Sequence, residues 1–288
     1  MRGQAFVSLF PILLVLTVFF FGAFAMALAQ SFGYAPQYGI QLFPTLNYYQ
    51  TLFSDTAFWG SLGLTFYYAL VPTLIGVGLS IGFALYLART FRSNSIALLF
   101  YQIPMVLPYL VGVSLAILLF SNGGLFARLL YQIGAIGSPS DFPRLINTSN
   151  GVGIMIVYLW KQVPFMTLIL YSNLLVLGNR EEEGAYLLGA DRWQVFQHIT
   201  LPKLVPSLVS ASLIVFAFNF GSFEVPYLLG AGFPNTLPVE AWRYFDSPDL
   251  NDRPKAMAIV VLVSLISASC LYVALYAYRR YEVSRGRK

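Results

Sequence analysis

The chain has 288 residues, of which 58% are hydrophobic and only 10% are charged. This composition excludes an ordinary soluble domain, in which about 25% of the residues are charged. In a membrane protein the net charge of +5 reflects topology, so it does not indicate a nucleic-acid partner.

Several apolar runs exceed the roughly 18 residues that mark a membrane-spanning helix. A transmembrane barrel would instead show alternating segments of about ten residues, and none are visible. We therefore expect an all-α polytopic membrane protein with six transmembrane helices. In chain order they cover residues 5–29, 58–88, 96–120, 151–175, 206–229 and 256–278.

The first apolar run, residues 5–29, ends in MALAQ, which resembles a signal-peptide cleavage site. The run is longer than the roughly 7–15 residues of a signal-peptide core, so we expect an uncleaved first helix. Cys270 is the only cysteine, which excludes a disulfide within the chain. Its place in an apolar run predicts a packing role.

The distribution of Lys and Arg predicts the orientation of the six helices, because these residues are in excess on the cytoplasmic side. With a cytoplasmic N-terminus, the inner segments carry most of them. These residues are Arg2, Arg89, Arg92, Arg180, Arg192, Lys203, Arg279, Arg280, Arg285, Arg287 and Lys288. We therefore expect both termini in the cytoplasm, together with the polar loop at residues 180–205.

Local chemistry predicts two short helices in that loop. Residues 180–188 are rich in helix formers, and three acids near their start complement the helix dipole. Gly189 permits the left-handed geometry that ends a helix, and Asp191 can cap a second helix over residues 192–198. Two prolines, Pro202 and Pro206, are expected to stop it before the fifth span. From physics alone, the partly apolar loop could dock onto a protein or lie on lipid headgroups.

The loop also carries a spaced pattern: Glu183, Gly184, Ala185, Gly189, Ile199, Leu201 and Pro202. It resembles the Glu-Ala-Ala, x3, Gly, x9, Ile-x-Leu-Pro signature of ABC importer permeases, and only Gly184 departs by replacing the first Ala. The resemblance extends over roughly residues 59–278. It implies a type I ABC importer permease fold in the inner membrane, with this loop acting as a coupling helix on a cytoplasmic ABC ATPase.

The resemblance further implies partners and a division of the chain. The partners are an ATPase dimer, a second permease subunit (identical or a paralogue), a periplasmic or lipid-anchored solute-binding protein, a small solute and membrane lipid. Residues 1–57 form a first helix with a periplasmic segment, 58–280 the transmembrane domain and 281–288 a basic tail. The chain has no phosphate-binding loop, so ATP hydrolysis must come from the partner. We expect no cofactor, and no catalytic or metal site can be built around the lone His198.

Two charged residues fall inside expected spans, Lys161 in the fourth and Glu224 in the fifth. Charges at such depth are costly, by at least about 2.5–3.5 kcal/mol, so they should face a cavity or each other. Asn219 and Ser222 add hydrogen-bonding groups nearby. Three interpretations stay open: these residues line a translocation pathway, Lys161 and Glu224 form a structural pair, or Glu224 lies at the outer mouth.

The solute class is suggested by two stretches, FNFGSFEVPYLLG and TLPVEAWRYFDSPDLNDRPKAMAI. They are similar to permeases of the polyamine and ferric-iron branch. A sugar importer of the same architecture is the first alternative. A membrane scaffold or sensor whose loop docks a non-ATPase partner is an alternative of another class.

Overall fold

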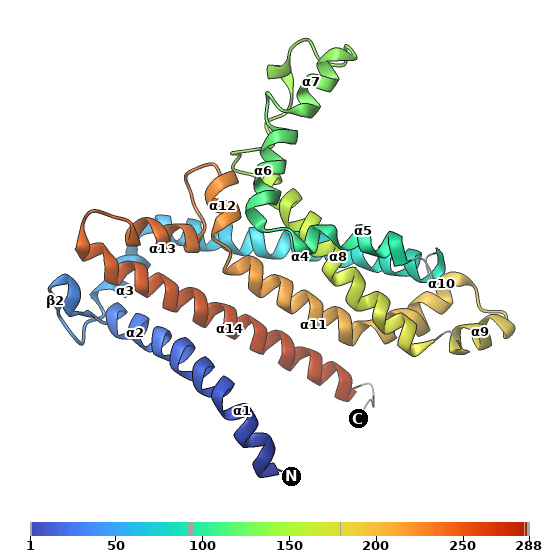
Figure 1. Ribbon diagram of the computed structural model, residues 1–288, viewed down its shortest axis with the longest axis horizontal. Coiled ribbons are helices and arrows are strands. Elements are labelled where there is room, and N and C mark those ends of the chain that lie inside the picture. The colour runs from blue at the N-terminus through green and yellow to red at the C-terminus, as the bar shows by residue number, and fades with distance from the viewer. Residues whose placement is uncertain (1, 91–94, 179, 285, 287–288) are drawn as a thin grey trace. The chain divides into compact units, whose positions relative to one another are not determined.

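The structure is a computed structural model that describes residues 2–90, 95–178, 180–284 and 286. Within them, six helical stretches are long and apolar enough to cross a membrane, which confirms the predicted all-α fold with six spans (Figure 1). These stretches are Leu9–Ser31, Thr56–Ala88, Tyr109–Gln132, Val152–Leu177, Arg192–Phe220 and Leu250–Val283.

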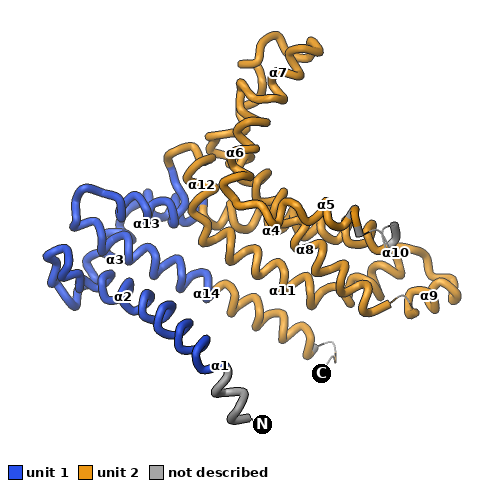
Figure 2. Tube along the Cα trace, in the orientation of Figure 1, with its two compact units in different colours: residues 1–64, 234–269 blue, residues 65–233, 270–288 orange. Residues whose placement is uncertain are grey.

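The chain divides into two compact units (Figure 2). The first contains Met1–Leu64 and Pro234–Ser269, and the second contains Thr65–Phe233 and Cys270–Lys288. Two long helices, α4 (Thr56–Thr90) and α14 (Arg253–Ser284), contribute residues to both units.

The first unit begins with α1 (Arg2–Leu16), a π-helical turn (Thr17–Phe21) and α2 (Gly22–Ser31). A short antiparallel pair follows, in which β1 (Tyr34–Ala35) and β2 (Ile40–Gln41) flank a 3₁₀ turn at Pro36–Tyr38. The later elements are α3 (Asn47–Ser54), the start of α4, α13 (Leu237–Phe245), a 3₁₀ turn (Leu250–Asp252) and the start of α14.

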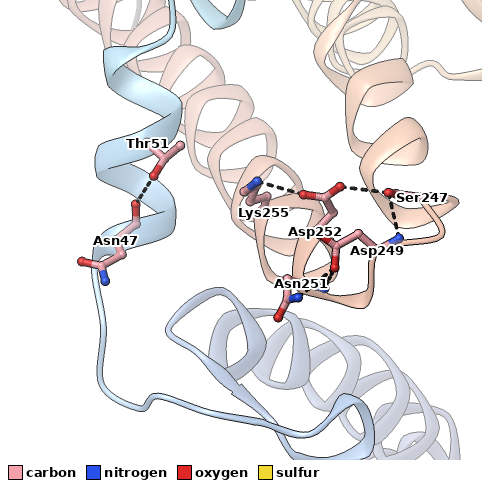
Figure 3. Close-up of polar contacts among 7 residues, drawn as sticks. All are labelled: Asn47, Thr51, Ser247, Asp249, Asn251, Asp252 and Lys255. Carbon is pink, nitrogen blue, oxygen red and sulfur yellow. Dashed lines mark hydrogen bonds and ion pairs between the residues drawn. The ribbon is translucent and has the colours of Figure 1, made fainter.

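The core of the first unit lies between α3, α4, α13 and α14. Its buried residues are Leu52, Phe58, Leu237, Ala241, Ala258 and Ile259. A polar turn joins α13 to α14, as Figure 3 shows. There Asp252 accepts hydrogen bonds from Ser247 Oγ at 2.9 Å and from Lys255 Nζ at 2.8 Å. Because Asp249 Oδ1 also accepts from the backbone N–H of Asn251 at 2.9 Å, side chains fix the start of α14.

The second unit is built around α8 (Val152–Leu177), which packs against helices α5, α6, α11 and α12. Their bounds are Ser95–Val106 for α5, Tyr109–Phe120 for α6, Leu201–Phe220 for α11 and Glu224–Leu229 for α12. A further helix, α7 (Leu125–Gln132), and a 3₁₀ turn (Pro139–Asp141) lie between α6 and α8. The loop after α8 holds α9 (Arg180–Leu187), α10 (Arg192–Val195) and a π-helical turn at Phe196–Thr200.

The predicted third span, residues 96–120, is interrupted between α5 and α6. The break falls at Leu107 and Pro108, where Pro108 has an extended ψ of 152°. Proline lacks the N–H that would continue the helix, and it disfavours helical geometry in the residue before it. The interruption leaves the last carbonyl groups of α5 without helical donors.

The predicted fifth span, residues 206–229, has different ends in the structure. Pro202 does not stop a helix; it lies in the first turn of α11, directly after a π-helical turn. Pro206 also lies inside α11, and the π-helical turn joins α10 to α11 without a gap. The helix ends at Phe220 before Gly221, so Glu224 does not lie within it but is the first residue of the separate α12.

Candidate functional site

Two predicted features of the loop between α8 and α11 are present, the turn at Gly189 and the cap at Asp191, whereas the second helix continues into α11. Gly189 adopts a φ of +87°, the left-handed conformation that ends α9. Asp191 Oδ1 accepts hydrogen bonds from the backbone N–H groups of Trp193 and Gln194, both at 2.8 Å. The Gln194 side chain returns a bond by accepting from the Asp191 N–H at 2.9 Å. This capping box rigidly sets the start of α10.

Two side-chain contacts tie α9 to the region where α11 begins. Thr200 Oγ1 donates to Glu182 Oε1 at 2.8 Å, and Lys203 Nζ lies 3.0 Å from Glu181 Oε2. Thr200 is buried and the Lys203 side chain is only 14% exposed, so these contacts are partly shielded from solvent. Two polar contacts therefore join α9 to the start of α11 and the turn before it, in addition to the backbone.

Among the exposed large hydrophobic side chains of the loop, three are more than 60% exposed. Leu187 is 89% exposed, Leu188 is 90% exposed and Trp193 is 63% exposed. Trp193 is held in place by stacking on Phe196, with 5.5 Å between the ring centroids. Large exposed apolar side chains on an ordered element are typical of an interaction surface.

The residues of the spaced motif are divided between two places. Glu183, Gly184 and Ala185 lie in α9, and Gly189 forms the turn after it. The remaining members, Ile199, Leu201 and Pro202, lie in the π-helical turn and the first turn of α11. A Cβ added at Gly184 would meet no atom within 4 Å, so Ala would fit here and the departure from the motif has no steric consequence.

The second place of interest is the break between α5 and α6. Lys161, near the middle of α8, donates a 3.0 Å hydrogen bond to the carbonyl oxygen of Pro104 and another to that of Leu107. Its ammonium also lies 4.5 Å from the centroid of the Tyr109 ring. The positive charge thus sits where the last carbonyl groups of α5 carry partial negative charge, which stabilises both.

The next residue, Gln162, contacts α11. Its amide and that of Asn219 on α11 exchange hydrogen bonds, one of them 3.2 Å from Asn219 Nδ2 to Gln162 Oε1. Asn219 Nδ2 also lies 3.4 Å from Thr73 Oγ1 on α4. All three side chains are buried, so this network joins α4, α8 and α11.

A pocket of about 430 Å³ opens beside Lys161 and Gln162. Tyr109 and Phe218 form part of its wall and stack with 4.9 Å between ring centroids. The full lining is Met105, Leu107, Tyr109, Lys161, Gln162, Phe165, Ile214, Val215 and Phe218. It contains one ammonium, one amide and three aromatic rings, and no carboxylate belongs to the described lining.

The structure therefore separates the four predicted pathway residues. Lys161 lines the pocket, whereas Asn219 lies behind it as the partner of Gln162. Ser222 lies in the turn between α11 and α12, and Glu224 starts α12, where a carboxylate complements the helix dipole. None of the ion pairs among the described residues joins Lys161 to Glu224. The sequence interpretation passed over Gln162 and Tyr109, although an amide inside an apolar span was a visible signal.

Comparison with known proteins identifies a family for this architecture. The family described as binding-protein-dependent transport system inner membrane component matches residues 75–282. A probable ABC transporter permease of Sinorhizobium fredii is 31% identical over 234 residues, which are 79% of this chain and 74% of that protein. A trehalose/maltose transport system permease of Thermococcus litoralis is 26% identical over 289 residues, covering 96% and 94%.

A solved structure shares the fold. It is a bacterial ABC transporter involved in the import of the acidic polysaccharide alginate, with a TM-score of 0.79 and 17% sequence identity. The superposition covers 96% of this chain and 95% of that one. Further relatives carry the names of ferric, spermidine/putrescine and sulfate systems, so the polyamine and ferric-iron branch is only one of several that the chain resembles.

Proposed function

This chain belongs to the family of binding-protein-dependent transport system inner membrane components, and we propose a separate role in import for each of its two sites. It is a permease subunit of an ABC importer, a multi-pass membrane protein and not an enzyme. The loop at residues 180–205 receives the movement of an ATPase, and the pocket beside Lys161 forms part of the solute pathway.

The coupling role rests on one observation, the exposure of Leu187, Leu188 and Trp193 in a loop whose second helix is capped and whose first helix contacts Lys203 of α11. A partner that covers these side chains can push α9 and α10 as a unit. The motif residues Glu183, Gly184, Ala185 and Gly189 lie on the same element, with Ile199, Leu201 and Pro202 at its junction with α11. A cytoplasmic ABC ATPase dimer is the proposed occupant, and the relative named as a probable ABC transporter permease supports it.

The decisive experiment is copurification with the ATPase subunit. Leu187→Ser with Leu188→Ser should reduce the amount of ATPase recovered, whereas Leu175→Ser near the end of α8 is a control on an exposed residue outside the loop. Equal recovery with the loop variant would contradict the docking role. Failure of the wild-type chain to recover any ATPase would favour the alternative of a scaffold or sensor that binds a non-ATPase protein.

The family description names a binding protein, which supports an external solute-binding protein, periplasmic or lipid-anchored, that delivers the solute. We also propose that a second permease subunit, identical or a paralogue, completes the pathway. Both termini and the loop lie in the cytoplasm, as the basic residues predict. We divide the chain into a first helix with its external segment (1–57), a transmembrane domain (58–280) and a basic tail (281–288); the family match over 75–282 supports the middle part.

The pocket lining favours a neutral or anionic hydroxylated solute, the sugar-importer alternative, over a polyamine or ferric ion. A cation would meet the ammonium of Lys161 and no carboxylate among the described lining residues. Hydroxyl or carboxylate groups would instead find the amide of Gln162 and the remaining N–H of Lys161. The aromatic walls, Tyr109, Phe165 and Phe218, suit the apolar faces of a sugar ring.

The solute class is tested with the cognate binding protein. Its binding should be screened against sugars, acidic sugars, polyamines and ferric iron, and uptake of each compound that binds should then be measured in proteoliposomes. Binding and uptake of a polyamine alone would contradict the assignment from the pocket lining, while leaving the coupling role intact.

A further inference from the structure

The end of α14 carries an arginine-rich pocket that the transport function does not use. We propose that it binds the phosphate of an anionic phospholipid. The pocket has a volume of about 720 Å³ and is lined by Tyr276, Arg279, Arg280, Tyr281 and Val283. Two adjacent guanidinium groups at one pocket make it strongly cationic.

Within residues 2–90, 95–178, 180–284 and 286, the two arginines have no carboxylate partner. None of the ion pairs among the described residues involves Arg279 or Arg280. The one carboxylate on this stretch of α14, Glu282, accepts a hydrogen bond from the hydroxyl of Tyr278 one turn earlier. Arg280 lies over the Tyr276 ring with 5.5 Å to its centroid, which orients the guanidinium without using its N–H donors. The pocket therefore presents charge and hydrogen-bond donors that need an anion.

The position of the pocket selects a lipid as the source of that anion. The last apolar span of the chain extends to Val283, so Arg279 and Arg280 lie in its final turns. On the same helix Tyr272 and Tyr276 stack at 6.4 Å, and tyrosines at the end of a span occupy the level of the lipid headgroups. Guanidinium groups bind phosphate oxygens in pairs, and basic residues beside a span attract anionic lipids.

Apolar neighbours of the pocket distinguish a lipid from a soluble phosphate. Val273 is 63% exposed and Val283 is 76% exposed, so hydrocarbon flanks the arginines along the helix. Acyl chains can cover these residues while the phosphate contacts Arg279 and Arg280. Inorganic phosphate would leave the same side chains uncovered and should bind far more weakly.

The test uses the full-length chain in a neutral detergent. Equilibrium binding of fluorescent phosphatidylglycerol is compared with that of phosphatidylcholine, and inorganic phosphate is added as a competitor. Arg279→Gln with Arg280→Gln should weaken phosphatidylglycerol binding about 30-fold, because each basic residue near an anionic lipid contributes about a fivefold effect. Arg128→Gln with Arg144→Gln is the control for an equal loss of charge elsewhere.

The outcomes separate the alternatives. Loss of phosphatidylglycerol binding in the α14 variant alone, with phosphatidylcholine binding unchanged, supports the site. Equal losses of lipid binding in both variants indicate a general charge effect and overturn the proposal. Displacement of the lipid by millimolar inorganic phosphate also overturns the proposal. If the Gln variant fails to fold, Arg279→Lys with Arg280→Lys is used instead, because it keeps the charge. Lipid binding is then measured at low and high salt in the wild type and in this variant. Binding that does not change with salt overturns the proposal.

Discussion

The ammonium of Lys161 lies 3.0 Å from the carbonyl oxygen of Pro104, so a charge in α8 completes the hydrogen bonding of the broken end of α5. The cost of a charge inside a span is thereby met by backbone carbonyl groups and by the dipole of another helix. Since Lys161 also lines the pocket, one side chain fixes the shape of the pocket wall and supplies its only cation among the described lining residues.

The first prediction is that Lys161→Met destabilises the protein. The change leaves the carbonyl groups of Pro104 and Leu107 without a donor, and a hydrogen bond to a charged group contributes about 1.5–3 kcal/mol. We expect the midpoint of thermal unfolding in detergent to fall by about 3–6 °C, at about 2 °C per kcal/mol for a chain of this length, with reduced solute uptake. Lys161→Arg keeps the charge and several donors, and should lose less on both measures.

The same variant decides whether Lys161 pairs with Glu224. No ion pair joins them among the described residues, so the effects of Lys161→Met and Glu224→Gln on stability should add within about 0.5 kcal/mol. If the double variant loses clearly less stability than the two single variants lose together, the two residues are in contact. That result would restore the interpretation of a structural pair.

The second prediction concerns the buried amides of Gln162 and Asn219. Either residue replaced by Leu leaves the other amide without its partner, which costs about 1–3 kcal/mol when the group stays buried. The double replacement removes both polar groups and should therefore cost less than the two single losses combined. Thermal unfolding of the three variants measures this, with Ser114→Ala on α6 as an exposed polar control. Strict additivity would contradict a direct bond.

The six spans were predictable because length and composition alone decide whether a helix can cross a membrane. The interruptions within them were harder. The sequence predicted one helix over residues 96–120 although Pro108 lies inside it. Hydropathy does not register the N–H that proline lacks. Likewise the run to residue 229 stayed apolar past Gly221, so the end of α11 and the start of α12 at Glu224 were missed.

The loop was predicted better than the pocket, for a physical reason. The geometry of Gly189 and the cap at Asp191 depend on residues at most three positions away, so the local sequence contains the signal. The partners of Lys161 are backbone carbonyl groups 54 and 57 residues distant, and any residue type supplies a carbonyl. No sequence pattern marks such a contact; it depends on how α5 and α8 pack.

The third prediction concerns topology. Single cysteines are introduced at Gln194 in the loop and at Ser149 before α8, both exposed, in a background where Cys270 is replaced by Ala. In intact cells a membrane-impermeant thiol reagent should label position 149 and spare position 194, because the basic residues place the loop in the cytoplasm. Permeabilised cells should show labelling at both positions. Labelling of position 194 from outside would reverse the orientation.

The last prediction is that Gly189 is essential for coupling. Its φ of +87° is strongly disfavoured for a β-branched residue, although an added Cβ would meet no atom within 4 Å. Gly189→Val should therefore redirect α10 by backbone strain alone, without a clash and without disturbing insertion of the spans. We expect solute-stimulated ATP hydrolysis in proteoliposomes to fall at least about tenfold, equivalent to about 1.4 kcal/mol of coupling free energy.

The control for this change is Gly184→Ala, one turn earlier in the same loop. Gly184 lies inside α9 with equally open surroundings, so a methyl group there should favour the helix by up to about 1 kcal/mol and leave coupling intact. Opposite responses of two glycines in one loop would separate a requirement for left-handed geometry from mere sensitivity to added bulk. Normal stimulation of the Gly189→Val complex would instead show that the orientation of α10 does not transmit the ATPase movement.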